Sequence, residues 1–304
     1  MPTLKPRPVP LADLVFHPEH DAAYQHFQGA QAHPFSARAG RLGRRNAWWL
    51  AEAALLSYWD PAEAFPRFRS AGLEADFLEA GALQAYVAWN ETAVIVSFRG
   101  TEPDEWGDVL DDAVFVLKPG HRRGTFVHAG FKAAIDRVWP ALDARLATLS
   151  SSRAVWFSGH SLGAALATLA ADRWPDTAGV CSLGSPRVGD RAFAAAFNMR
   201  FLRRARRYVN DNDIVTHVPP PVILPLSYQH VGGLRHIAPD GTITARPPRL
   251  AHYVSDLFGD CRHIFEVMDG LARHQLQQAP DFILDHMPRA YSVDMWNDYI
   301  THGD

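Results

Sequence analysis

The sequence predicts an α/β fold, with a mostly parallel central sheet and helices on both of its faces. Short, continuous apolar runs are typical of strands buried on both faces. The chain has three of them, at 93–98, 154–157 and 179–183, and a further strand is expected at 205–210. Helix-forming stretches separate these runs. Apolar strands that alternate with helices indicate a parallel sheet covered on both sides.

The length and composition fit one large domain. The chain has 304 residues, of which 47% are hydrophobic, and this is enough to bury a large core. Residues 46–304 show no repeat and no clean break, so we expect them to form a single domain. Residues 1–45 are rich in proline and lack periodicity. They predict an N-terminal arm that lies over the domain or is partly mobile.

The first predicted elements come in the order helix, hairpin, helix. Asn46 is expected to cap an aromatic-rich helix. Strands at 83–89 and 93–98 form a hairpin, since three turn-forming residues separate them. A long amphipathic helix follows over 128–149, where apolar residues recur every three and four positions.

The stretch 156–167 carries the strongest functional signal. It contains Gly159-His160-Ser161-Leu162-Gly163, which is the nucleophile-elbow pattern of a serine on a sharp turn between a strand and a helix. The context fits, because a buried strand precedes the motif and alanine-rich helix formers follow it. Glycines are needed because bulkier neighbours would collide with the adjacent strand and helix. The pattern predicts an α/β-hydrolase with Ser161 as its nucleophile.

A serine at neutral pH is a poor nucleophile and needs a histidine base and an orienting carboxylate. In this fold the acid and then the histidine follow the serine along the chain. The acid should follow the strand that ends at Asn210, where Asp211 and Asp213 both qualify. Near the C-terminus the candidates for the base are His252, His263, His274 and His286. Spacing alone leaves both choices open.

The segment after the buried strand 93–98 is expected to serve the same site. Gly100 and Thr101 follow the strand directly, where an α/β-hydrolase supplies its second oxyanion donor. Residues 102–120 combine an acidic stretch with the apolar run 113–117, which favours a lid over the serine. The acidic residues lack the alternating spacing of a calcium loop, so we expect no metal site there.

Taken together, these motifs resemble those of the class 3, fungal-type lipase family of the α/β-hydrolase fold. They occur in the family's order at 98–101, 128–131, 159–163, 184–189, 212–215 with 219–220, and 285–286 with Tyr291. The resemblance implies that Ser161 is the nucleophile, Asp213 the orienting acid and His286 the base. It also implies an oxyanion hole from Thr101 and Leu162, a lid after Thr101, and no cofactor.

The expected activity is hydrolysis of carboxylic esters, with acylglycerols as substrates and an acyl-enzyme on the serine as intermediate. Phospholipase A1 and an esterase of soluble esters are alternatives within the same chemistry. A non-catalytic lipid-binding member of the fold is the alternative from another class. The intact set of Ser161, Asp213, His286 and Thr101 argues against it.

Composition excludes several other classes. The net charge of −3 and the dispersed basic residues do not indicate a nucleic-acid partner. The basic cluster at 203–207 is expected to be a solvated helix end or an ion-pair face. No apolar run approaches the roughly 18 residues of a membrane span. Residues 1–8 lack the apolar core of a secretory signal, so we expect a cytoplasmic location.

The remaining cysteines and histidines are expected to be structural. Cys181 lies in an apolar run and predicts a buried free thiol, and it shares no metal-ligand spacing with Cys261. We interpret His128, His160 and His230 as structural residues, because most histidines in a chain are neither ligands nor catalysts.

Overall fold

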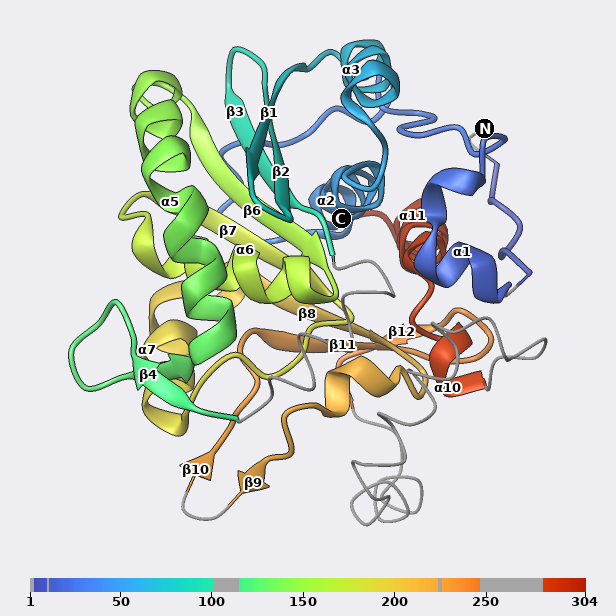
Figure 1. Cartoon of the computed structure of the whole chain (residues 1–304). Helices are drawn as coiled ribbons and strands as arrows, with labels where there is room; N and C mark the ends of the chain where they lie inside the picture. Colours follow the sequence, from blue (N-terminus) through green and yellow to red (C-terminus); the bar gives the residue numbers. More distant parts are fainter. Residues whose placement is uncertain (1–2, 10, 101–114, 224–225, 247–280) are drawn as a thin grey trace.

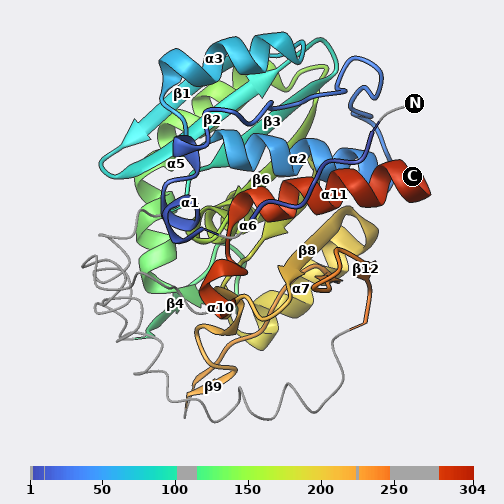
Figure 2. The ribbon, with the colours of Figure 1, turned by 90° about the vertical axis from the view of Figure 1, so that its right-hand side faces the viewer.

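The computed structural model describes residues 3–9, 11–100, 115–223, 226–246 and 281–304. The described chain forms an eight-stranded sheet with helices packed on both faces (Figures 1 and 2). The sheet strands are β1 (Glu74–Ala80), β2 (Leu83–Trp89), β3 (Ala93–Phe98), β6 (Ala154–His160), β7 (Thr177–Leu183), β8 (Ala205–Asn210), β11 (Gly233–Ile237) and β12 (Ile243–Thr244). Short strands outside it are β4 (Leu117–Pro119), β5 (Phe126–His128), β9 (Val222–Ile223) and β10 (Leu226–Ser227).

The helices alternate with the strands as the sequence predicts. The α-helices are α1 (Ala12–Phe16), α2 (Arg44–Leu56), α3 (Pro61–Ser70), α5 (Ala129–Leu149), α6 (Leu162–Arg173), α7 (Arg191–Phe201), α10 (Asp281–Leu284) and α11 (Pro288–His302). Three 3-10 turns are η1 (Pro18–His20), η2 (Leu202–Arg204) and η3 (Ile214–His217).

The strand order in the sheet is β1-β2-β3-β6-β7-β8-β11-β12. The five strands β3, β6, β7, β8 and β11 pair in parallel, while β1 and β2 at one edge and β12 at the other pair antiparallel. The predicted fold class, an α/β-hydrolase with a mostly parallel sheet, is confirmed.

The apolar strands are buried because both faces of the sheet carry a core. On one face Ile95 and Trp156 pack with α2, α3 and α11. On the other face Val96 and Phe157 pack with α5, α6 and α7. Successive side chains of a strand point to opposite faces, so a strand covered on both sides is apolar at every position. This arrangement explains the continuous apolar runs in the sequence.

The N-terminal segment is built into the first of these cores. Tyr24 and Phe27 are buried in it, and the carboxylate of Glu52 on α2 binds the segment through hydrogen bonds. Glu52 is completely buried and accepts hydrogen bonds from Tyr24 Oη at 2.7 Å, Phe27 N at 3.0 Å and Lys5 Nζ at 3.2 Å. Lys5 provides the opposite charge that such a buried carboxylate requires.

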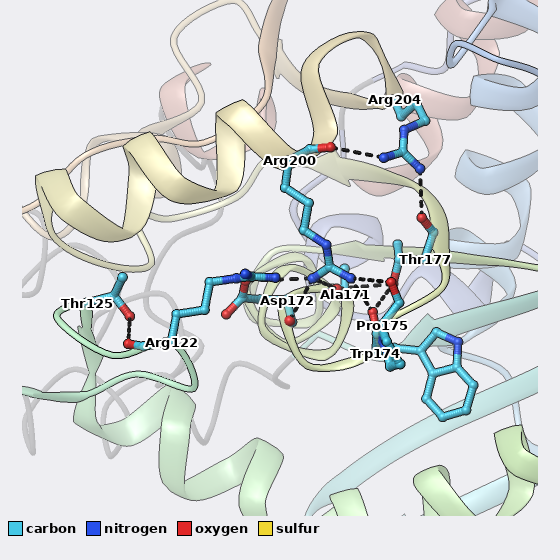
Figure 3. A network of polar contacts seen from close by, with 9 residues as sticks. All are labelled: Arg122, Thr125, Ala171, Asp172, Trp174, Pro175, Thr177, Arg200 and Arg204. Atoms are coloured by element: carbon cyan, nitrogen blue, oxygen red, sulfur yellow. Dashed lines mark hydrogen bonds and ion pairs between the residues drawn. The ribbon is translucent and has the colours of Figure 1, made fainter.

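Arginine side chains donate hydrogen bonds to the backbone carbonyls at the C-terminal end of α6, the helix that begins directly after Ser161. Arg200 donates to the carbonyl oxygens of Asp172, Trp174 and Pro175 at 2.7, 2.5 and 2.7 Å (Figure 3). The last four carbonyls of a helix lack partners within the helix, and cations are favourable at that end. Arg204 donates to Thr177 O and Arg200 O at 2.9 Å each (Figure 3), so it binds backbone instead of a carboxylate.

Two local predictions need correction or restriction. The prediction that Asn46 caps a helix is wrong: α2 begins at Arg44 after Gly43, and the Asn46 amide instead pairs with the backbone of Ser36. Of the predicted lid at 102–120, residues 101–114 lie outside the described residues. The following part is anchored, since β4 pairs with β5 and Ala129 N donates to Val116 O at 2.8 Å.

Other predictions are confirmed. Cys181 is a buried free thiol, and burial raises its pKa; Cys261 lies outside the described residues. A search of the helices in the described part of the chain finds none that is both long and apolar enough to cross a membrane.

Candidate active site

Ser161 occupies the tight turn between β6 and α6. Its backbone has φ +60° and ψ −131°, a conformation that non-glycine residues rarely adopt and that marks functional sites. A Cβ on Gly159 would lie 2.3 Å from the backbone of Gly163, and a Cβ on Gly163 would lie 2.2 Å from Phe98 O. Only glycines fit these two positions, as the motif predicts.

The side chain of Ser161 is buried and is not used to hold the fold together. The residue is 1% exposed, and its Oγ has no hydrogen-bond partner among the described residues. Its backbone N–H donates to Leu183 O at 2.9 Å, which fixes the turn against the end of β7. At the start of α6 the first N–H groups have no acceptor within the helix, and Leu162 provides the first of them.

Asp213 and His286 form a buried pair. Nδ1 of His286 lies 2.8 Å from both Oδ1 and Oδ2 of Asp213, and the two residues are 5% and 0% exposed. Asp213 is the residue before η3, and its Oδ1 also accepts from Val215 N at 3.0 Å. A carboxylate at Nδ1 places the ring proton there, so Nε2 is left as the basic nitrogen.

Two close approaches bring this pair to the turn of the serine, and a third brings the end of β3 to it. The rings of His160, which precedes Ser161, and His286 have centroids 4.2 Å apart. A Cβ on Gly184, at the end of β7, would lie 2.7 Å from Asp213 Oδ2 and 2.9 Å from His286 Cε1. On the opposite side a Cβ on Gly100 would lie 3.2 Å from Ser161 Cβ. The carboxyl ends of the parallel strands β3, β6, β7 and β8 therefore meet around Ser161.

Tyr291 on α11 supports the carboxylate from behind. Its hydroxyl donates to Asp213 Oδ2 and accepts from Asn210 N at 3.0 Å. Tyr291 is completely buried. Burial and the charge of Asp213 hold the pKa of the Tyr291 hydroxyl well above its ordinary value, so it stays protonated and keeps donating.

His160 has a different environment from His286. Its Nδ1 shares a hydrogen bond of 2.8 Å with the hydroxyl of Tyr58, in the turn that follows α2. Burial, reinforced by the charge that His286 can carry, holds the pKa of His160 well below its ordinary value. His160 is therefore neutral at physiological pH. Its position agrees with a structural role, as do those of His128, which caps α5, and His230, which bonds Thr216 O at 2.9 Å.

Asp285 adds an unusual carboxyl group next to His286. Burial, with a further contribution from the charges of Asp211 and Asp213, raises the pKa of Asp285 to about 7. Its Oδ2 accepts one hydrogen bond, from Asn212 N at 3.2 Å. The group therefore changes charge within the physiological pH range.

The structure brings three of the predicted site residues together. The other candidates for the base (His252, His263 and His274), and Thr101, lie outside the described residues. Ser161, Asp213 and His286 converge, whereas Asp211 is partly exposed, at φ +38°. Tyr58 was not singled out by sequence reasoning. Nothing in its aromatic-rich helix distinguishes it from the core aromatics around it.

A possible metal-ligand group lies elsewhere in the described chain. Ligand atoms of His17, Glu19 and His20 lie within 4.8 Å of one another. These residues belong to the N-terminal segment, and none of them contacts the Asp213–His286 pair through a hydrogen bond.

Comparison with known proteins shows which family this region resembles. Residues 95–223 match a family model described as lipase (class 3). The chain is 35% identical over 144 residues to a lipase of Rhizomucor miehei, covering 43% of this chain and 39% of that protein. It is 32% identical over 155 residues to a chloroplastic phospholipase A(1) of Arabidopsis thaliana, covering 43% and 34%.

A third relative aligns over a longer stretch. The chain is 30% identical over 177 residues to a secreted mono- and diacylglycerol lipase of Malassezia restricta, covering 53% of this chain and 54% of that protein. In each of these three alignments the chain spans less than two thirds of the relative's length.

Solved structures agree on the fold. The native propeptide complex of Rhizomucor miehei lipase superimposes with a TM-score of 0.51 and 25% identity, covering 64% of this chain and 68% of that one. A lipase from Rhizopus microsporus var. chinensis gives a TM-score of 0.51 at 23% identity, covering 71% and 80%. The chain thus has an α/β-hydrolase fold, and its residues 95–223 are similar to the class 3 lipase family.

Proposed function

We propose that this protein hydrolyses carboxylic esters of glycerolipids, with Ser161 as nucleophile, His286 as general base and Asp213 as the acid that orients it. The observation that carries the proposal is the buried Asp213–His286 pair, joined at 2.8 Å, beside a serine on a strained turn. Neither the pair nor the strain serves the sheet or its cores. Strained backbone and buried charge persist where a site requires them.

The geometry gives each residue a step. Ser161 Oγ attacks the ester carbonyl carbon while His286 Nε2 takes the hydroxyl proton. The tetrahedral intermediate then expels the alcohol, which leaves with that proton, and an acyl group remains on Ser161. Water attacks the acyl group with His286 again accepting a proton, which releases the carboxylic acid and restores the serine. Asp213 stabilises the imidazolium in both halves of the reaction.

The oxyanion of each tetrahedral intermediate needs donors. The N–H of Leu162 at the start of α6 is well placed for this role, because the N-terminal end of a helix carries partial positive charge. Thr101 is the proposed second donor, by resemblance to the family. The position of Gly100, the residue before Thr101, supports this proposal, because Gly100 lies against Ser161.

The proposed substrates are acylglycerols. The printed names of the relatives include a lipase, a mono- and diacylglycerol lipase and a phospholipase A(1), and all three activities cleave an ester bond between a fatty acid and glycerol. Phospholipase A1 is the second candidate activity. No cofactor takes part in the proposed reaction. The proposed lid is the part of the segment 102–120 that precedes the anchored residues Val116 to Pro119.

The test is the rate of p-nitrophenyl butyrate hydrolysis by wild type, Ser161→Ala and Ser152→Ala. Ser161→Ala should reduce the rate by several orders of magnitude without a change in melting temperature, because Oγ holds no structural bond. Ser152→Ala is the matched control, since Ser152 is exposed after α5. A fluorophosphonate should label Ser161 in wild type. Labelling of another serine, or activity retained in Ser161→Ala, would refute the assignment.

The substrate class needs a separate panel. Wild type should be compared on emulsified diacylglycerol and triacylglycerol, on phosphatidylcholine, and on soluble short-chain esters. Faster release of fatty acid from acylglycerols supports the lipase activity, and faster release from the sn-1 position of phosphatidylcholine supports phospholipase A1. Turnover of soluble esters alone would exclude both lipid activities while leaving the catalytic assignment intact.

A further inference from the structure

A basic pocket lies at the end of the sheet opposite to Ser161. Its volume is about 300 Å³, and its charged lining consists of Arg41, Arg44, Arg206, Arg235, Asp298 and Asp304. It is formed by the beginning of α2, the C-terminal part of α11 with the residues after it, and the strands β8 and β11. In the sequence these residues are scattered between positions 41 and 304, so no local pattern reveals the pocket.

The sheet register explains why two arginines meet there. In the parallel pairing of β8 with β11, Arg206 is opposite Gly233 and Tyr208 is opposite Arg235. Alternate residues of a strand share a face, so Arg206, Tyr208 and Arg235 all point to the face that α2 and α11 cover. Tyr208 also lines the pocket and can add a hydroxyl donor to it.

The acidic residues of the pocket are already paired. Asp298 Oδ2 lies 2.8 Å from Arg44 Nε. Asp304 pairs with Arg45 Nη2 at 3.2 Å and accepts from Arg45 N at 2.9 Å, at the first turn of α2. Arg41, Arg206 and Arg235 have no carboxylate partner within the part of the chain that the structure describes. The pocket therefore carries uncompensated positive charge.

Arg206 is held in place rather than extended into solvent. Its Nη1 donates to Ala205 O at 3.0 Å, and its Nε is buried without a hydrogen-bond partner in the described structure. A Cβ on Gly233 would lie 3.1 Å from Arg206 Nη1, so the glycine leaves room for the guanidinium. Burial and repulsion from Arg235, Arg203 and Arg41 lower the pKa of Arg206.

The contrast with neighbouring arginines is informative. Arg200 and Arg204 lie close to Arg206 in the sequence, and Nη1 and Nη2 of each donate to backbone carbonyls (Figure 3). In Arg206 only Nη1 does so within the described structure, to Leu202 O and Ala205 O. The sequence predicts a solvated helix end or an ion-pair face for the cluster 203–207, whereas Arg204 of that cluster binds backbone carbonyls. Arg206 alone of this group lines the pocket, together with arginines from two other segments. Such a convergence of like charges costs free energy unless an anion neutralises it.

We infer that this pocket binds a phosphate group, either as a free phosphate or as the headgroup of an anionic lipid. Guanidinium groups bind phosphate oxygens in pairs of parallel hydrogen bonds, and three of them with a tyrosine hydroxyl match a dianion with several acceptor oxygens.

The pocket is separate from the catalytic pair. Arg206 stands near the start of β8, while Asn210, which bonds Tyr291 beside Asp213, ends the same strand. Four residues of strand correspond to roughly 13 Å. The inference consequently holds or fails independently of the proposed ester hydrolysis.

The test is isothermal titration of the full chain with inorganic phosphate in 150 mM NaCl at neutral pH. Arg235→Gln should weaken binding by about tenfold or more, since hydrogen bonds to charged groups are among the strongest. Arg137→Gln is the matched control. It removes the same charge from an exposed position on α5, at the other face of the sheet, and should bind as wild type does.

A second variant distinguishes phosphate binding at a specific site from non-specific attraction of phosphate to positive charge. Gly233→Val displaces the Arg206 guanidinium without changing the net charge, and should also weaken phosphate binding. Melting temperatures of all variants check that each is folded. No saturable heat with wild type, or equal loss in Arg235→Gln and Arg137→Gln, would overturn the inference, as would wild-type affinity in folded Gly233→Val.

Vesicles distinguish the two sources of phosphate. Sedimentation with phosphatidylcholine vesicles that contain phosphatidic acid, lost in Arg235→Gln and absent with phosphatidylcholine alone, supports a lipid headgroup. Binding of inorganic phosphate without sedimentation supports a soluble phosphate compound. Absence of both refutes the site.

Discussion

Gly184→Ala isolates the contribution of the Asp213–His286 geometry to catalysis. Gly184 directly follows β7 and has φ +55°, and a Cβ there would lie 2.7 Å from Asp213 Oδ2 and 2.9 Å from His286 Cε1. Ordinary van der Waals contacts begin at 3.4 Å. The carboxylate and the imidazole must therefore move by about half an ångström or more, because the methyl group belongs to rigid backbone and cannot yield.

The expected effect has two parts. An alanine in the left-handed region costs about 1–2 kcal/mol, which lowers the melting temperature by roughly 2–8 °C in a domain of this size. The displacement acts on catalysis separately: misplacing a catalytic group by about 1 Å can reduce the rate by about 100-fold. We expect kcat for p-nitrophenyl butyrate to fall by about 10- to 100-fold, with a smaller change in KM.

Gly81→Ala provides the matched control. Gly81 has a similar positive φ of +66°, but an added Cβ would meet no atom within 4 Å. The control should lose stability through backbone strain and keep its kcat. Equal kcat values for the two variants, measured well below both melting temperatures, would show that the Asp213–His286 geometry does not limit the reaction.

Two further predictions concern the surroundings of the pair. Tyr291→Phe removes the donor to Asp213 and the acceptor of Asn210 N–H. The free energy of unfolding, measured in urea, should fall by about 1–3 kcal/mol, and kcat should also fall. A variant as stable as wild type would contradict the observed hydrogen bonds. The pKa of Asp285 is about 7 in the folded state and about 3.9 in the unfolded chain. Between these values the folded state binds a proton that the unfolded chain has lost. The stability of wild type should therefore fall as pH rises from about 4 to 7. Asp285→Asn cannot ionise, and its advantage in melting temperature should be small at pH 5 and larger at pH 8; a gap independent of pH would refute this explanation.

Strands buried on both faces could be predicted from the sequence, and half-exposed edge strands could not. β3, β6 and β7 are apolar at nearly every position because helices cover both sides. β1 has the sequence Glu-Ala-Asp-Phe-Leu-Glu-Ala and is partly or fully exposed throughout, so its composition resembles a loop. Its strand conformation depends on pairing with β2, which is a tertiary interaction.

Polar residues inside helices were the second source of error. Asn46 has the chemistry of a capping residue, but its amide binds Ser36 in the N-terminal segment, and Gly43 precedes the helix instead. Glu52 lies among aromatic and alanine residues, which predict a helix packed in the apolar core and do not predict a buried, hydrogen-bonded carboxylate. Its partners come from residues 5, 24 and 292, too far along the chain for any local pattern to indicate them.

For the candidate site, chain order reduced the acid to two residues and the base to four. The choice between Asp211 and Asp213 depends on the turn after β8, which exposes the first and buries the second beside His286. That turn is a property of the folded chain, and the family resemblance was the only sequence argument that selected Asp213.

The buried carboxylate of Glu52 also has a consequence for biosynthesis. Ser292 Oγ donates to it at 2.9 Å across 240 residues of sequence, and α11, which carries Ser292, covers the aromatic face of α2. Translation at about 5–20 residues per second separates the two helices by roughly 10 to 50 s. Throughout that interval Trp48 lacks its contact with Trp296 of α11, and the carboxylate of Glu52 lacks the hydrogen bond from Ser292. Ser161 likewise emerges well before His286, so the proposed catalytic set of Ser161, Asp213 and His286 is incomplete during that part of synthesis.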